Sequence, residues 1–246
     1  MRADRVTMAP KYRAVLARSA DRVEACLALR AAVFRGTAGL SDRDRFDDIC
    51  EHMAVERVDD GRVVACFRFM SLERGAAVDD TYSAQFYELS ALREFASPMI
   101  EMGRFCVDPG VRDADILRVA WGAMARIVEA RGAGLIFGCS SFAGTDEKRY
   151  YDAFAMLRDR HIAPSRWLPR IKAPRVFEFA RRLRRSADPK AAMRAMPPLL
   201  KTYLAMGGWV SDHAVVDRDL GTLHVFTGVE VGAIPAARRR SLLAGS

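Results

Sequence analysis

The chain has 246 residues, 50% of them hydrophobic, with 39 basic and 31 acidic residues and a formal net charge of +8. This length allows a sizeable core, and no apolar run is long enough to span a membrane, which excludes an integral membrane protein and favours a cytoplasmic one. The five cysteines are scattered and the four histidines lack metal-ligand spacing. We therefore expect buried thiols in a reducing compartment and no metal site.

The charge is distributed unevenly along the chain. Residues 41–60 hold eight acidic and three basic residues, whereas residues 166–201 hold eleven basic and two acidic ones. The acidic region suits a cationic ligand, and the basic region suits an acidic protein or an anionic membrane. A solvated face is the alternative for each region.

An arginine occupies a core position of the first predicted helix. Residues 12–17 are expected to form a first strand, and a helix is predicted from Asp21 to Phe34. Arg30 falls on the apolar stripe of that helix. A buried arginine needs a carboxylate partner or faces a cleft, although an arginine at the edge of the stripe can also reach solvent.

The next segment pairs an acidic loop with a hairpin. Ser41 to His52 is predicted to be a loop in which Asp44 and Asp47 can bind an amine. Residues 52–58 and 62–72 then form two strands around the turn signal Asp59-Asp60-Gly61. Both faces of the second strand are apolar, so Arg68 within it is a second interior cation.

The most informative segment is the predicted strand from Met99 to Val107, in which Glu101 and Arg104 interrupt apolar residues. Residues three apart face opposite sides of a flat strand, but a bulge at Gly103 would turn both side chains into one cleft. The spacing alone allows either a catalytic pair or a structural ion pair at a sheet edge. A helix follows, started by Asp113 or Asp115 and ended by Gly132, and then a short apolar strand.

The remaining elements are expected to be helical or to close the sheet. Residues 175–185 are predicted to form a short helix whose apolar face is typical of a helix on a membrane surface, or of one packed on the domain. The tail from Ala236 to Ser246 is expected to be mobile. Further helices are predicted at 82–96, 145–160 and 199–206, and closing strands at 215–217 and 222–231.

This order, with a bulged strand that leads into a helix, resembles the GNAT-like acyltransferase fold, an α/β (α+β) architecture whose mixed central sheet is flanked by helices. The motifs of the acyl-homoserine-lactone synthase family are similar to residues of this chain on a helix, a loop, a central strand and the bulged strand. The matching residues are Arg30 and Phe34, Asp44 and Asp47, Arg68, and Glu101 and Arg104.

The rest of the chain is more similar to a sister family, the ornithine lipid N-acyltransferases. The similarity is carried by EMGRFCVDPGVRDADILRVAWGAM at 101–124, YYDAFAMLRDRHIAP at 150–164 and PPLLKTYLAMGG at 197–208. It implies transfer of a 3-hydroxyacyl chain from acyl carrier protein to the α-amino group of L-ornithine, giving lyso-ornithine lipid. No tightly bound cofactor is expected.

One departure from ordinary acetyltransferases concerns the acyl donor. Those enzymes hold the pyrophosphate of coenzyme A in a glycine-rich turn at a helix start. Here the turn Arg112-Asp113-Ala114-Asp115 lacks those glycines, and its two carboxylates would repel a pyrophosphate. A carrier protein presents a single phosphodiester, so this turn favours acyl carrier protein as the donor.

The resemblance also implies roles for the site residues. Glu101 is the expected base, and Arg104 and Arg68 hold the substrate carboxylate or order the acidic loop, while Asp44 and Asp47 take the side-chain ammonium or pair with Arg30. Freed backbone N–H groups of the bulged strand are expected to stabilise the oxyanion. These N–H groups belong to Phe105, Cys106 and Val107.

The basic segment has two candidate partners, acyl carrier protein and the anionic inner face of the cytoplasmic membrane. The predicted patch residues are Arg181, Arg182, Arg184 and Arg185. A nucleic-acid partner is not expected, because few aromatic residues are interleaved with these basic residues.

We expect a single domain over residues 1–246, with 10–160 as its core and 161–246 as a basic helical segment plus closing strands. Three enzyme alternatives stay open. They are a lactone-forming signal synthase, another long-chain N-acyl amino acid synthase and an N-acyltransferase that uses coenzyme A.

Overall fold

The computed structural model describes residues 10–36 and 41–244, and a single large sheet runs through them. Its strand order is β1-β2-β3-β5-β6-β11-β10-β8, with β9 also paired to β11. All neighbouring strands are antiparallel except β5 and β6. The strands are β1 (Tyr12–Leu16), β2 (Glu51–Arg57), β3 (Val63–Leu72), β5 (Met99–Val107), β6 (Leu135–Ala143), β8 (Val176–Phe177), β9 (Trp209–Val210), β10 (Ala214–Asp217) and β11 (Thr222–Glu230).

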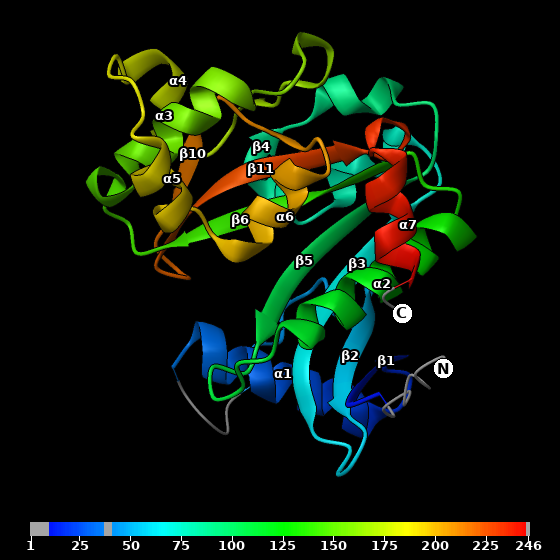
Figure 1. The fold of residues 1–246 in the computed structure, drawn as a ribbon. Coiled ribbons are helices and arrows are strands. Elements are labelled where there is room, and N and C mark those ends of the chain that lie inside the picture. The colour runs from blue at the N-terminus through cyan, green and yellow to red at the C-terminus, as the bar shows by residue number, and fades with distance from the viewer. Residues whose placement is uncertain (1–9, 37–40, 245–246) are drawn as a thin grey trace, which may run out of the picture.

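Helices lie on both faces of this sheet (Figure 1). The α-helices are α1 (Ala20–Phe34), α2 (Ala114–Ala130), α3 (Tyr151–Arg160), α4 (Phe179–Arg182), α5 (Pro189–Ala195), α6 (Pro198–Ala205) and α7 (Ala236–Ala244). The 3₁₀ turns are η1 (Gly75–Asp80), η2 (Ser83–Gln85), η3 (Ser90–Glu94), η4 (Glu147–Tyr150), η5 (Ser165–Trp167) and η6 (Val231–Ala233). A second, two-stranded sheet pairs β4 (Tyr87–Glu88) with β7 (Arg170–Ile171). The mixed sheet flanked by helices is the architecture that the sequence predicts.

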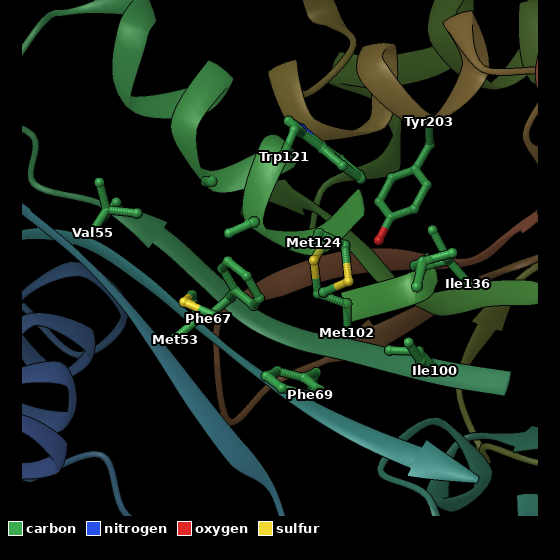
Figure 2. Packing of buried hydrophobic residues seen from close by; sticks show 14 of the residues in the cluster. Met53, Val55, Phe67, Phe69, Ile100, Met102, Trp121, Met124, Ile136 and Tyr203 are labelled. Carbon is green, nitrogen blue, oxygen red and sulfur yellow. The ribbon is translucent and has the colours of Figure 1, made fainter. Parts of the chain in front are cut away.

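Helix α2 begins and ends where the sequence predicts. The Asp113 side chain accepts the backbone N–H of Asp115 at 3.0 Å, and Gly132 follows the last turn with φ 59°. Its apolar stripe packs on the sheet, where Met124 lies beside Met102 in Figure 2. This packing holds the strand that carries Glu101 and Arg104.

The central feature of the sheet is the separation of β5 from β6. The two strands pair only from Met99 to Glu101, opposite Leu135 to Phe137, and then diverge as Figure 1 shows. At the divergence Gly138 packs against the backbone of β5, because a Cβ built on it would lie 2.2 Å from the Met102 carbonyl oxygen. Beyond this point each strand pairs only with its outer neighbour among the described residues.

The predicted bulge is present, but it lies one residue beyond Gly103. Gly103 pairs with Arg68 and Cys106 with Cys66, so Arg104 and Phe105 lie opposite the single residue Phe67. Arg104 has a left-handed backbone with φ 53°. A non-glycine residue in this region is uncommon and is typical of functional sites, where neighbouring contacts hold it.

Two predicted helices are wrong. Residues 82–96 form two 3₁₀ turns around the short strand β4, since side chains of this segment pack into the core from alternate directions. In residues 175–185 only α4 is helical, and β8 pairs with β10. Phe177, Phe179 and Leu183 are buried in the domain, so this segment presents no apolar face to a membrane.

Two further predictions need correction at element ends. The segment after residue 145 begins with η4, which Asp146 caps by accepting the backbone N–H of Lys148 at 3.1 Å, and α3 starts only at Tyr151. Within the tail predicted to be mobile, residues 236–244 form α7, and Leu242 packs on the apolar cluster beside α2. Residues 245–246 lie outside the described residues.

The close approach at Gly138 predicts the effect of a single methyl group. Gly138→Ala should lower the free energy of unfolding by about 1–3 kcal/mol, because the added carbon overlaps the Met102 backbone and forces the strands apart. Urea unfolding measures this difference. Gly103→Ala is the matched control, since its Cβ would meet only the Arg68 side chain at 3.9 Å. Equal unfolding midpoints for the two variants would contradict this packing.

Candidate functional site

Three aspartates of the acidic loop bind arginines from three different elements. Arg30 of α1 donates to Asp47 Oδ1 at 2.6 Å and to Asp42 Oδ2 at 3.0 Å. Its side chain is 1% exposed, so it is a core arginine with carboxylate partners rather than one that reaches solvent.

The arginines of β3 and β5 complete this network. Arg68 donates to Asp44 Oδ1 at 2.5 Å and to Asp47 Oδ1 at 2.8 Å. Arg104 donates to Asp42 Oδ2 and to Asp44 Oδ2, each at 3.1 Å. The structure therefore brings together all three arginines that the sequence singled out. Asp42 was missed, although the number of interior cations was a signal that a further carboxylate was needed.

Two carboxylates of this loop, Asp44 and Asp47, are held in their charged form. Burial alone would raise the pKa of Asp47, but hydrogen bonds from Arg30 and from the backbone N–H of Asp44 keep it well below its ordinary value. The pKa of Asp44 is also lowered, because Arg68 and Arg104 outweigh the effect of burial. The network therefore orders residues 42–47 at neutral pH.

Glu101 does not belong to this network. Its carboxylate is 4% exposed and accepts the backbone N–H groups of Tyr82 at 2.9 Å and Ser83 at 2.7 Å. Burial raises its pKa above the ordinary value, against the effect of these two hydrogen bonds. Because β5 is an interior strand and Arg104 binds Asp42 and Asp44, the alternative of a Glu–Arg ion pair at a sheet edge is wrong.

A cavity of about 200 Å³ lies where β5 and β6 diverge. Its polar lining comes from both halves of the sheet and from the segment after η1. The polar residues are Tyr82, Glu101, Arg104, Cys139, Ser140, Ser141, Asp217 and His224. Of the predicted site residues, Phe34, Glu101, Arg104 and Phe105 line this cavity, whereas Arg30 and Arg68 do not.

A polar cleft of about 280 Å³ adjoins the cavity. Tyr82, Arg104 and Asp217 line both spaces, and Asp44 lines the cleft. The Arg104 guanidinium lies 4.8 Å from the centre of the Tyr82 ring, which helps to fix its position. The combined space offers cationic, anionic and aromatic groups within one continuous site.

The cavity also has an apolar lining, which shares Met102 and Tyr203 with the cluster shown in Figure 2. The apolar lining residues include Met102, Phe105, Leu199, Leu200 and Tyr203. The cavity therefore offers polar groups that suit a charged ligand and apolar side chains that suit a hydrocarbon chain.

The predicted oxyanion residues have different surroundings. Phe105 lines the cavity, whereas the Cys106 side chain is buried on the other face of β5, with its sulfur 3.5 Å from that of Cys66, and Val107 does not line the cavity. The edge of β5 facing β6 has no strand partner beyond Glu101 within the described chain. Backbone groups on that edge are therefore open to a ligand in the cavity.

Several lining residues were missed by sequence reasoning, among them Asp217 and His224. His224 lies between apolar residues of β11 and is 2% exposed. The argument that identified Arg68, a polar side chain inside a strand with two apolar faces, applies to His224 as well and would have found it.

The start of α2 presents carboxylates where a pyrophosphate would need N–H groups. Asp113 accepts the N–H of Asp115 at 3.0 Å, and Asp108 accepts the N–H of Gly110 at 2.8 Å. Asp108 also binds Arg62 at 2.5 Å. These contacts occupy backbone N–H donors that could otherwise bind a phosphate group. They also place negatively charged carboxylates where that phosphate would lie.

The four arginines of the predicted patch are all exposed. Arg181 donates to Glu178 at 2.7 Å, and Arg185 donates to Asp152 at 2.7 Å. Within residues 10–36 and 41–244, neither the Arg182 nor the Arg184 side chain has a hydrogen-bond or ion-pair partner. The patch lies around α4, away from α2 in Figure 1.

In residues 10–36 and 41–244 no cluster of three or more histidine, cysteine, aspartate or glutamate side chains could hold a metal ion. Within the same ranges, no helix has the length and apolar character needed to cross a membrane.

The fold and site can be compared with known proteins. An acetyltransferase (GNAT) domain model matches residues 29–122, the part that contains the C-terminal end of α1, the loop network and β5. A solved N-acyl amino acid synthase from uncultured soil microbes has the same fold, with a TM-score of 0.52, 9% identity, and coverage of 91% of this chain and 94% of that one.

Sequence similarity to characterised enzymes extends over nearly the whole chain. The L-ornithine N(alpha)-acyltransferase of Brucella abortus is 28% identical, covering 86% of this chain and 81% of its own length. That of Rhodobacter capsulatus is 32% identical and covers 93% of each chain. Together with the GNAT-like fold and the cavity between β5 and β6, these matches show that the chain belongs to the L-ornithine Nα-acyltransferase family of N-acyltransferases.

Proposed function

We propose that this enzyme transfers a 3-hydroxyacyl chain from acyl carrier protein to the α-amino group of L-ornithine, giving lyso-ornithine lipid. The observation that carries the proposal is the family membership, at 32% identity over 93% of the chain. The cavity with its polar and apolar lining supports it, since the reaction joins a charged amino acid to a hydrocarbon chain.

The polar lining residues would bind ornithine, which carries one carboxylate and two amino groups. Arg104 is the arginine of the network that faces the cavity, so it is our candidate for the carboxylate. Asp44 is the most exposed of the three loop carboxylates, with 27% of its side chain accessible, and is our candidate for the side-chain ammonium. Arg30 and Arg68, buried behind the loop, would position Asp44 rather than touch the substrate.

The acyl donor would enter through the gap between β5 and β6, with its hydrocarbon chain against the apolar lining residues of the cavity. A carrier-protein donor is favoured over coenzyme A by the carboxylates Asp108, Asp113 and Asp115 at the start of α2. A pyrophosphate placed there would meet repulsion and few free N–H groups.

The proposed chemistry is aminolysis of a thioester. The α-ammonium loses a proton, the amine attacks the thioester carbon, the C–N bond forms, and the C–S bond breaks as the carrier thiol leaves with a proton. Glu101 is the proposed proton acceptor, directly or through water, because its buried carboxylate has a raised pKa and faces the cavity. Open backbone N–H groups on the free edge of β5 would stabilise the oxyanion.

The decisive test of the whole proposal is the product. Cells that express the chain should contain an ornithine-bearing lysolipid, detectable by mass spectrometry. The purified enzyme should acylate ornithine with 3-hydroxyacyl carrier protein and turn over the coenzyme A thioester poorly. Acylation of S-adenosylmethionine in place of ornithine would favour a lactone-forming synthase instead.

Glu101→Gln should lower kcat by about 10²–10⁴-fold, because the variant has no carboxylate to accept the ammonium proton. Steady-state turnover with ornithine and the acyl carrier thioester measures the loss. Since the amide also disturbs the contacts to Tyr82 and Ser83, thermal unfolding must show that the variant is folded.

The control for that variant is Glu56→Gln. Glu56 is a second buried strand carboxylate, 3% exposed, which binds Arg13 and Arg22 away from the cavity. The Glu56→Gln variant should be less stable than the wild-type enzyme but keep its kcat. A folded Glu101→Gln enzyme with wild-type turnover would rule out Glu101 as the base.

The exposed patch around α4 is the proposed docking surface for acyl carrier protein, which is acidic. Arg182→Glu with Arg184→Glu should raise the apparent KM for the carrier about three- to tenfold and weaken its dependence on salt, because these two guanidinium groups have no partner within the described chain. Arg126→Glu with Arg131→Glu reverses the same number of charges at the C-terminal end of α2, where Arg131 binds Glu51 at 2.8 Å, and should leave this KM unchanged.

The same charge-reversed protein distinguishes carrier docking from peripheral binding to the cytoplasmic membrane. Release from anionic vesicles without a change in KM would assign the patch to the membrane. If neither the KM nor vesicle binding changes, the patch is only a solvated face.

A further inference from the structure

His224 is a buried histidine in the wall of the cavity that no step of the reaction above uses. It projects from β11, is 2% exposed, and lines the cavity at the divergence of β5 and β6. Its Nε2 has no hydrogen-bond partner within residues 10–36 and 41–244. Several other buried side-chain polar atoms in the described residues also lack a partner, but none of them belongs to a residue that lines this cavity.

The hydroxyl of Tyr87 determines which ring nitrogen of His224 carries the proton. That hydroxyl donates its single proton to the His224 carbonyl oxygen at 2.8 Å. The His224 Nδ1 lies 3.1 Å from the Tyr87 hydroxyl oxygen. Because the hydroxyl proton is already used, Nδ1 is the donor in this contact, as an N–H group. A neutral ring protonated at Nδ1 carries a lone pair on Nε2, so the unpartnered nitrogen is an acceptor.

Ring packing holds the imidazole in place. Phe86 meets it edge to face with centroids 4.9 Å apart, and the Tyr87 ring lies at 5.6 Å. Burial lowers the pKa of His224 to about 3, with further lowering from His213 and Arg104, so the ring is neutral at pH 7. A buried acceptor left without a partner costs free energy, which a bound donor would recover.

We propose that the Nε2 of His224 accepts a hydrogen bond from the amino group of the acceptor substrate and orients that group for attack on the thioester. This inference rests on the proposed function and adds a substrate-contacting residue to it.

The surroundings of His224 favour an amine over other donors. Glu101 and Asp217 line the same cavity, so the region suits a group that begins as a cation. Glu101 binds Tyr82 and Ser83, and His224 contacts Phe86 and Tyr87 of the same short segment. With Glu101 taking one proton of the ammonium and His224 fixing another N–H, the nitrogen lone pair would be directed between them.

His224→Phe should lower kcat/KM for ornithine about tenfold or more, because phenylalanine keeps the ring packing and removes the acceptor. The KM for the acyl carrier thioester should stay within about twofold of wild type. General structural damage would change the kinetics of both substrates, so an effect confined to ornithine indicates a contact with ornithine. His224→Gln, whose amide oxygen can reach the position of Nε2, should recover activity to within about threefold of wild type.

His213→Phe is the matched control. His213 is as buried as His224, its Nε2 also lacks a partner in the described ranges, and its ring lies 5.3 Å from that of Tyr87, but it does not line the cavity. The His213→Phe variant should lose about as much stability as His224→Phe but keep the wild-type kcat/KM for ornithine. If the phenylalanine variants at 224 and 213 have equal activity, His224 has no contact with the substrate.

A measurement without turnover tests the same contact. Nitrogen-15 spectra of histidine-labelled protein at pH 7, with His224→Gln used for assignment, should show His224 neutral and protonated at Nδ1. Addition of L-ornithine should move the Nε2 resonance in the direction of a new hydrogen bond. A ring protonated at Nε2, or an Nε2 resonance that does not respond to saturating ornithine, would overturn the inference.

These outcomes separate the inference from the proposed function. A wild-type enzyme that makes no acylornithine disproves the function whatever His224 does. A wild-type enzyme that makes acylornithine, together with a fully active His224→Phe variant, disproves only the role of His224.

Discussion

The early separation of β5 from β6 is the constraint on which the rest of the structure depends. Three residue pairs hold the strands together up to Glu101 and Phe137, and beyond them each strand pairs only outward among the described residues. A sheet that stayed paired would use its own backbone groups and leave no space between its halves. The divergence instead leaves an open strand edge beside a cavity, and the sheet supplies both walls as rigid elements.

The arginine–aspartate network holds these walls at a fixed position. A buried guanidinium is costly without a carboxylate, so Arg30, Arg68 and Arg104 draw the loop against α1, β3 and β5. Arg35 extends the network across the molecule, because it binds Asp42 at 3.0 Å and Asp219, in the turn between β10 and β11, at 2.9 Å. Charges in the first third of the chain thus connect to the strand that carries His224.

Much of this arrangement follows from local sequence patterns, and the rest depends on packing. The hairpin, α2 and the bulged strand have strong periodic or turn signals, and the sequence predicts each of them. Interior charges such as Arg68 were informative because burial forces them to find partners. Residues 82–96 and 175–185 misled the prediction, since their spacing resembles a helix while their side chains fill the core from short turns and strands. Which arginine faces the cavity and which is buried behind it depends on long-range geometry that no local pattern encodes.

The environment of the cavity also bears on the amine itself. Burial raises the pKa of Glu101 and lowers that of His224, and each shift favours the uncharged form of the side chain. The same desolvation acts on any ammonium brought to this face and lowers its pKa toward that of the neighbouring carboxylate. In the proposed mechanism, this desolvation makes proton transfer from the substrate to Glu101 easier than it is in water, and the neutral amine that results is the form that can attack a thioester. On that proposal a single physical cause, the low polarity behind residues 82–87, prepares both the base and the nucleophile.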